Sequence, residues 1–269
     1  MKKTLFLFLA ALVSLSAFSQ DTLKVMTYNI RNGNGMDKVR SYERIADVIL
    51  KHDPDVVAVQ ELDSMTKRSN QTYVLGEVAK LTRMKDLYGP AINYSGGKYG
   101  VGILSKKQPL KVSQHPLPGR GEKRTFLMAE FEDYIFCCTH LALTEEDRNL
   151  SLAIIDSIAA CQTKPFIIAG DMNAEPGSDF VNGLQKNYRI FNNLKQPTWP
   201  APEPREMIDY IAVWKEHSEG LPNGHTWVVE EPVASDHRPI MSKIRVAKKA
   251  DQIFACKPYL QNPVDGGIT

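Results

Sequence analysis

An alternation of short apolar runs with amphipathic helical segments is the strongest constraint on the fold of this chain. Helices are expected at residues 42–52, 73–82 and 146–161. Strands are expected at residues 22–30, 54–62 and 165–170, as a group between 87 and 140, and near 208–213, 226–229 and 239–246. Helices that are separated by several consecutive strands predict a mixed β-sheet system with its helices on the outside.

The first 19 residues have the layout of a secretory signal peptide. Lys2 and Lys3 precede an apolar run from Leu5 to Val13, and small residues at positions 17 and 19 are spaced like a cleavage site. This run is shorter than the roughly 20 apolar residues of a membrane span, and no later stretch reaches that length. We therefore expect an exported protein without a transmembrane segment, secreted or periplasmic, whose mature chain begins near residue 20.

Charge and cysteine content narrow the function classes only slightly. The formal net charge of +2 falls to about zero once Lys2 and Lys3 are removed, so the chain lacks the basic character of many nucleic-acid binders. Export permits disulfides, but the four cysteines show no metal-type spacing. Cys137 and Cys138 lie inside an apolar run and are expected to be buried as small hydrophobic residues.

Polar side chains with catalytic chemistry follow the apolar runs at six places. They are Asn29, Glu61, His140, the pair Asp171 and Asn173, Asp209, and the pair Asp236 and His237. This recurrence indicates that several strand ends converge on one polar mouth. Oxygen ligands suit Mg²⁺ or Mn²⁺, and histidines beside acids add proton transfer and charge stabilisation. Together these groups meet the requirements for hydrolysis of a phosphate ester.

Asp171 and Asn173 stand two residues apart, directly after the apolar run that ends at Gly170. In an extended segment, residues at this spacing point to the same side. The carboxylate could then orient a water molecule or a metal, while the amide donates to a phosphate oxygen. The alternative is a plain turn, since Gly, Asp and Asn are common turn formers.

Seven segments carry a resemblance to a known family. They are "TYNIRNGNGMD", "PDVVAVQELD", "YGVGILSK", "THLALTEEDR", "AGDMNAEP", "IDYI" and "SDHRP". In order and spacing they resemble the endonuclease/exonuclease/phosphatase superfamily, which includes deoxyribonuclease I, abasic-site endonucleases, neutral sphingomyelinases and inositol polyphosphate 5-phosphatases. The resemblance covers about residues 22–246. It implies an α/β four-layer sandwich of two packed mixed β-sheets flanked by helices, with a divalent-metal phosphoesterase site at one end.

The resemblance also implies a role for each candidate residue. Glu61, Asn29 and Asp236 would serve the metal, and Asp171 and Asn173 would serve the attacking water and the phosphate. His237 resembles the catalytic histidine, acting either as a base or as a cation, and Asp209 the acid that orients its ring. His140 would donate to a phosphate oxygen. The substrate-contact candidates, each with packing or ordinary surface charge as the alternative, are Tyr99, Arg124 and Arg205.

One residue departs from the nuclease branch of this superfamily. Arg31 stands where that branch tends to carry a metal-serving acid, so a second metal is doubtful. We expect a Mg²⁺- or Mn²⁺-dependent phosphoesterase, a monomer, acting by direct water attack on a phosphodiester or phosphomonoester of a small molecule or lipid headgroup. The alternatives are a secreted nuclease acting on DNA or RNA and a non-catalytic binding module on the same fold.

The domain organisation expected from these observations has three parts. Residues 1–19 are the signal peptide, residues 20–246 the catalytic domain, and residues 247–269 a tail. The stretch "KPYLQNPVDGGIT" in this tail resembles the opening of the fibronectin-like β-domain of calcineurin-like and purple acid-type metallophosphatases. We therefore expect the tail to be the start of a second, truncated domain.

Overall fold

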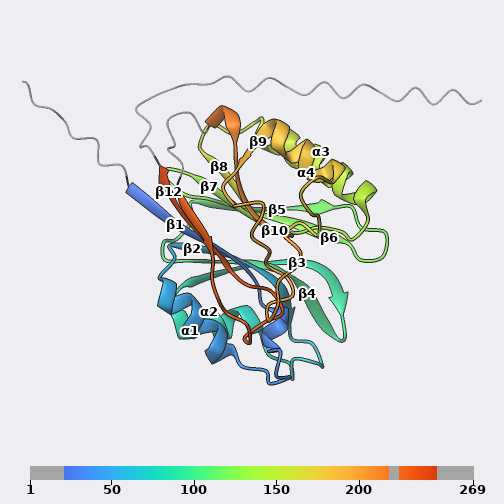
Figure 1. Ribbon diagram of the computed structural model, residues 1–269. Helices are drawn as coiled ribbons and strands as arrows, with labels where there is room; N and C mark the ends of the chain where they lie inside the picture. Colours follow the sequence, from blue (N-terminus) through green and yellow to red (C-terminus); the bar gives the residue numbers. More distant parts are fainter. Residues whose placement is uncertain (1–20, 218–223, 247–269) are drawn as a thin grey trace, which may run out of the picture.

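The computed structural model describes residues 21–217 and 224–246. The expected signal peptide and tail lie outside these residues. Two six-stranded mixed sheets pack face to face (Figure 1). The first sheet has the order β11 (His225–Val228), β12 (Ile240–Val246), β1 (Asp21–Asn29), β2 (Val56–Ser64), β4 (Gly97–Ser105) and β3 (Lys85–Tyr94). The second has the order β5 (Lys111–Leu117), β6 (Arg124–Glu130), β7 (Ile135–His140), β8 (Phe166–Asp171), β10 (Asp209–Trp214) and β9 (Tyr188–Ile190).

Helices cover the outer face of each sheet. Figure 1 places α1 (Tyr42–His52) and α2 (Val74–Thr82) against the first sheet, and α3 (Glu145–Ala159) and α4 (Asp179–Asn187) against the second. Two short 3-10 helices, Arg31–Gly33 and Lys215–His217, complete the described elements. None of the described helices is long and apolar enough to cross a membrane. The result is the predicted four-layer sandwich.

Three hydrophobic clusters hold the four layers together, and the alternation of side chains along each strand creates them. In β7, Phe136 and Cys138 face the cluster between the sheets, whereas Ile135 and Cys137 face the cluster beneath α3 and α4. Both faces of the strand are buried, which explains its continuous apolar sequence. Cys137 and Cys138 are thus buried free thiols, as expected from the sequence.

The helix α1 begins and ends at the residues that the periodicity predicts. The hydroxyl of Ser41 accepts a hydrogen bond from the backbone N–H of Arg44 at 3.1 Å, and Asp53 closes the helix in a left-handed conformation. The helix α4 was missed because Asn182 and Gly183 weaken its helical pattern. Packing of its apolar face onto the second sheet stabilises it instead.

The strand directions bring the predicted site residues to one end of the sandwich. β1 and β2 are parallel, as are β7 and β8, so each pair ends at the same edge. β10 is antiparallel to β8 and β12 is antiparallel to β1, so these two strands begin at that edge. The polar residues at or near the ends of β1, β2, β7 and β8 therefore lie close to those at the start of β10 and before β12, at one end of the sandwich.

Candidate active site

A buried amide joins the two sheets at the centre of the site. Nδ2 of Asn29, at the end of β1, donates to Oδ2 of Asp171 at 3.0 Å and to Oε1 of Glu61 at 3.1 Å. Both hydrogens of this amide are thereby used. The backbone carbonyl of Asn29 accepts the hydroxyl of Ser235 at 2.7 Å, which fixes the loop that carries His237.

His237 lies between two carboxylates. Its Nδ1 is 2.9 Å from Oδ2 of Asp209, and its Nε2 is 3.7 Å from Oδ2 of Asp171. The hydroxyl of Thr198 also donates to Oδ2 of Asp209, at 2.5 Å. Burial lowers the pKa of His237, but Asp209, Asp171 and Asp236 outweigh it and raise that pKa to about 10. The ring is therefore an imidazolium at neutral pH.

His140 has the opposite electrostatic character. It ends β7 beside Asp171, with Nε2 at 3.5 Å from Oδ2 of that carboxylate. Burial lowers its pKa to about 4, because desolvation outweighs the attraction of Asp171, and Arg124 and His237 add to the decrease. A neutral imidazole is a donor through one ring nitrogen only. The site thus pairs one charged and one neutral histidine around a single carboxylate.

Glu61 is held in an unusual backbone conformation. The register of β2 against β4 shifts between Val59 and Leu62, and Glu61 in this bulge has φ +60°. A left-handed conformation at a non-glycine residue is costly, and such residues cluster at functional sites. Burial raises the pKa of Glu61, the Asn29 amide lowers it, and the charges of Asp236 and Asp171 raise it further.

The extended conformation expected for the Asp171–Asn173 segment is wrong. Asn173 has φ +49°, and its backbone N–H donates to Oδ1 of Asp171 at 2.9 Å, which forms a side-chain turn. Its own amide donates to the carbonyl of Leu141 at 2.9 Å. Asp171 and Asn173 nevertheless both line the site cavity, so the turn brings together the side chains that were expected to share a face.

A cavity of about 410 Å³ opens above these groups. Predicted residues that line it are Glu61, Tyr99, Arg124, His140, Asp171, Asn173, Asp236 and His237. Asn29 and Asp209 lie behind it, hydrogen-bonded to lining residues. Arg205 does not line the cavity, and its side chain is 76% exposed and pairs with Glu203. Arg31 lies at the edge of the site, with Nε at 3.6 Å from Oδ2 of Asp236.

Four polar or aromatic residues around this cavity were not predicted from the sequence. Trp199, Glu122 and Glu206 line it, and Thr198 supports Asp209 from below. Three of them lie in the segment "PTWPAPEPREMIDYI", which ends in the Asp209 motif. Its unusual Pro, Trp and Glu content is the sequence signal that could have directed attention to it.

The acidic groups offer two arrangements for a divalent cation. Ligand atoms of Asp171, Asp209 and His237 lie within 4.8 Å of one another. Oδ2 of Asp209, however, already accepts hydrogen bonds from His237 and Thr198, which a cation there would displace. At the cavity wall, the charges of Asp171 and Asp236 raise the pKa of Glu61, and a hard cation relieves such repulsion. Glu61 and Asp236, beside Asp171, therefore fit a cation better.

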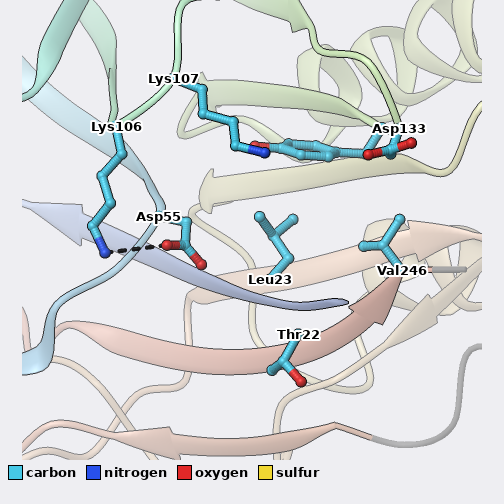
Figure 2. A pocket seen from close by; sticks show the side chains of 8 residues that line it. Thr22, Leu23, Asp55, Lys106, Lys107, Asp133 and Val246 are labelled. Atoms are coloured by element: carbon cyan, nitrogen blue, oxygen red, sulfur yellow. Dashed lines mark hydrogen bonds and ion pairs between the residues drawn. The ribbon is translucent and has the colours of Figure 1, made fainter. Parts of the chain in front are cut away.

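A cavity of about 300 Å³ lies at the opposite end of the sandwich, where β1 begins and β12 ends (Figure 2). Lys106 and Lys107 line it together with Asp55 and Tyr134, and Lys106 pairs with Asp55 at 3.1 Å. None of the described residues that line this cavity is a histidine, and the described lysines and acids offset one another. The groups suited to phosphate-ester chemistry lie at the other end.

A family model matches most of the chain. The model described as Endonuclease/Exonuclease/phosphatase family matches residues 26–237. This range contains every predicted site residue, from Asn29 to His237. A comparison with curated proteins finds no match.

Solved structures share the fold. An endonuclease/exonuclease/phosphatase from Beutenbergia cavernae is 21% identical, with a TM-score of 0.65 over 84% of this chain and 72% of its own. A mannosyl-6-phosphatase of Bacteroides thetaiotaomicron is 17% identical, with a TM-score of 0.63 over 82% and 99%. The human Nocturnin catalytic domain is 19% identical, with a TM-score of 0.63 over 84% and 94%. These likenesses confirm the deoxyribonuclease I-like architecture.

Proposed function

Because the chain belongs to the endonuclease/exonuclease/phosphatase family, we propose that it is a divalent-cation-dependent phosphoesterase that hydrolyses a phosphodiester or phosphomonoester by direct attack of water. The observation that carries this proposal is the contact of His237 with Asp209 on one side and Asp171 on the other, at the wall of the cavity. In it a buried carboxylate orients a histidine whose far nitrogen faces a second carboxylate. The enzyme is exported, and its substrate is a small molecule or lipid headgroup ester.

Each catalytic residue has a separate role in the reaction. Asp171 orients the attacking water and accepts its proton as the new P–O bond forms. The leaving oxygen separates from phosphorus and takes up a proton from solvent. His237, held as an imidazolium by Asp209, stabilises the negative charge that builds on the phosphate. His140, being neutral, donates a hydrogen bond to a non-bridging oxygen.

Glu61 and Asp236 would hold the cation beside Asp171, with Asn29 fixing the carboxylates of Glu61 and Asp171. A bound Mg²⁺ or Mn²⁺ supplies neutralisation of the phosphate oxygens. Arg31 already places a positive charge 3.6 Å from Asp236, which favours a single cation. Arg124 and Tyr99 are substrate contacts in this proposal. The Arg124 guanidinium is buried at the cavity wall and pairs with Glu122 at 2.7 Å.

Turnover of p-nitrophenyl phosphate and bis-p-nitrophenyl phosphate tests the proposal. Activity should vanish in EDTA and return with Mg²⁺ or Mn²⁺, because the proposed ligands are oxygens. Full activity in EDTA would refute the metal assignment. If neither Mg²⁺ nor Mn²⁺ supports any turnover, the result would favour the non-catalytic binding module. A panel of plasmid DNA, RNA, sphingomyelin and phosphoinositides distinguishes a nuclease from a phosphoesterase that acts on a small molecule or a lipid headgroup.

A further inference from the structure

Trp199 and Glu206 form a pair at the wall of the active-site cavity. They are partners in an isolated antiparallel bridge, in which the N–H of Trp199 donates to the carbonyl of Glu206 at 3.0 Å and the N–H of Glu206 donates back at 2.8 Å. Residues directly opposite each other in such a bridge carry their side chains on the same side. Both residues line the cavity that contains Asp171 and His237.

The loop that carries this pair is fixed to the catalytic residues. The N–H of Ala201 donates to the carbonyl of Asp236 at 2.7 Å, and the N–H of Arg238 donates to the carbonyl of Thr198 at 2.9 Å. The hydroxyl of Thr198 reaches Asp209. Trp199 and Glu206 are therefore held in place before a substrate arrives, which lowers the entropic cost of binding.

The Glu206 carboxylate is available to a ligand. It is half-buried, and no described residue forms a hydrogen bond or ion pair with it. Its neighbour Arg205 is exposed and pairs with Glu203. An ionised carboxylate only accepts hydrogen bonds, so it suits hydroxyl donors and repels a second phosphate.

The cavity continues into a groove of about 580 Å³ that is also acidic. The two share Leu143, Asn173, Glu206 and Ile208, and the groove adds the carboxylates of Glu145, Glu175 and Asp179. Among the residues that the structure describes, the only basic one that lines this groove is Arg148, which is buried and donates to the backbone carbonyls of Ala142 and Leu143. A nucleic acid strand lying in this groove would face four carboxylates with little compensation.

We propose that Trp199 and Glu206 form the leaving-group subsite and select a neutral, hydroxyl-rich ring, such as a sugar, over a polynucleotide. The ring lies against the indole, its hydroxyls donate to Glu206, and the groove holds any further sugar units. This inference rests on the proposed phosphoesterase function and names its substrate class. Water attacks phosphorus, the P–O bond to the sugar breaks, and the sugar leaves as an alcohol after taking up a proton.

The test compares kcat/KM for a hexose 6-phosphate, p-nitrophenyl phosphate, a mononucleotide and a single-stranded oligonucleotide under one Mg²⁺ condition. The hexose phosphate should exceed both nucleotide substrates by at least tenfold. The variant Glu206→Ala should lose about 10- to 100-fold on the hexose phosphate, mainly through KM, as expected for a hydrogen bond to a charged group. That loss should exceed its loss on p-nitrophenyl phosphate by at least tenfold.

Two further variants serve as controls for this test. Glu203→Ala removes a carboxylate from the same loop outside the cavity and should leave all rates unchanged. If Glu206→Ala fails to fold, Glu206→Gln preserves the shape and removes the charge. Equal losses on all substrates, no loss, or a preference for either nucleotide would overturn the inference. Absence of turnover of both p-nitrophenyl phosphate and bis-p-nitrophenyl phosphate in the unaltered protein would refute the proposed function itself, and this inference with it.

Discussion

At the scale of single residues, the proposed catalysis depends on the coupling between Asp209 and His237. The 2.9 Å contact fixes the ring and favours its charged form. We expect Asp209→Asn to lower kcat by about 10²- to 10⁴-fold because the ring loses both effects. The double variant with His237→Ala should be hardly worse than His237→Ala alone. Steady-state kinetics of the four proteins measures this coupling, and additive losses would contradict it.

The same contact predicts how stability depends on pH. The pKa of His237 is about 10 in the folded protein, above the 6.5 of an unperturbed histidine, so its stabilising contribution is complete below pH 6.5. That contribution is lost as pH rises from 6.5 to 10. In EDTA, the free energy of unfolding should decrease across this range by up to about 1.4 kcal/mol per pH unit.

Urea unfolding between pH 6 and 10 checks this prediction. His237→Gln should flatten the decrease, whereas His225→Gln, on the exposed edge strand β11, should not. An unchanged slope in His237→Gln would show that other groups cause the pH dependence.

At the scale of elements, the parallel pair β7 and β8 positions His140 opposite Asp171. A Cβ added at Gly170 would lie 2.0 Å from the carbonyl oxygen of Thr139 in the neighbouring strand. Gly170→Ala should therefore lower the free energy of unfolding by about 3 kcal/mol. It should also reduce kcat, because β7 and β8 must separate next to His140 and Asp171. Gly121→Ala is the control, since its Cβ meets nothing within 4 Å. Equal stability of the two variants would contradict this reading of the sheet.

The elements also show what a sequence can predict. The strands and the convergence of their ends were predictable because burial on both faces produces continuous apolar runs, and parallel strands end at one edge. The bulge at Glu61 and the turn at Asn173 were not, because left-handed conformations depend on local hydrogen bonds that the pattern does not reveal. Trp199 and Glu206 were missed because backbone bonds to Asp236 and Arg238, more than 30 positions later, position their loop.

At the scale of the whole molecule, cation binding should stabilise the fold. The charges of Asp171 and Asp236 destabilise the ionised carboxylate of Glu61 at the cavity wall, and a cation that binds only the folded state raises the stability of that state. At 100 times the dissociation constant, Mg²⁺ should add about 2.7 kcal/mol and raise Tm. Thermal unfolding with and without Mg²⁺ measures the effect without any substrate. Glu61→Gln should reduce it, while Glu203→Gln should retain it; an unchanged effect in Glu61→Gln would place the cation elsewhere.

In the proposed mechanism Asp171, between the two histidines, serves the attacking water in phosphate-ester hydrolysis. The most direct measurement is the turnover of bis-p-nitrophenyl phosphate by Asp171→Asn in saturating Mg²⁺, with circular dichroism to verify folding. Asparagine keeps the shape of the side chain but cannot accept the proton, so we predict that kcat falls at least 10³-fold while the fold persists. A folded Asp171→Asn variant that retains near-normal turnover would contradict the account.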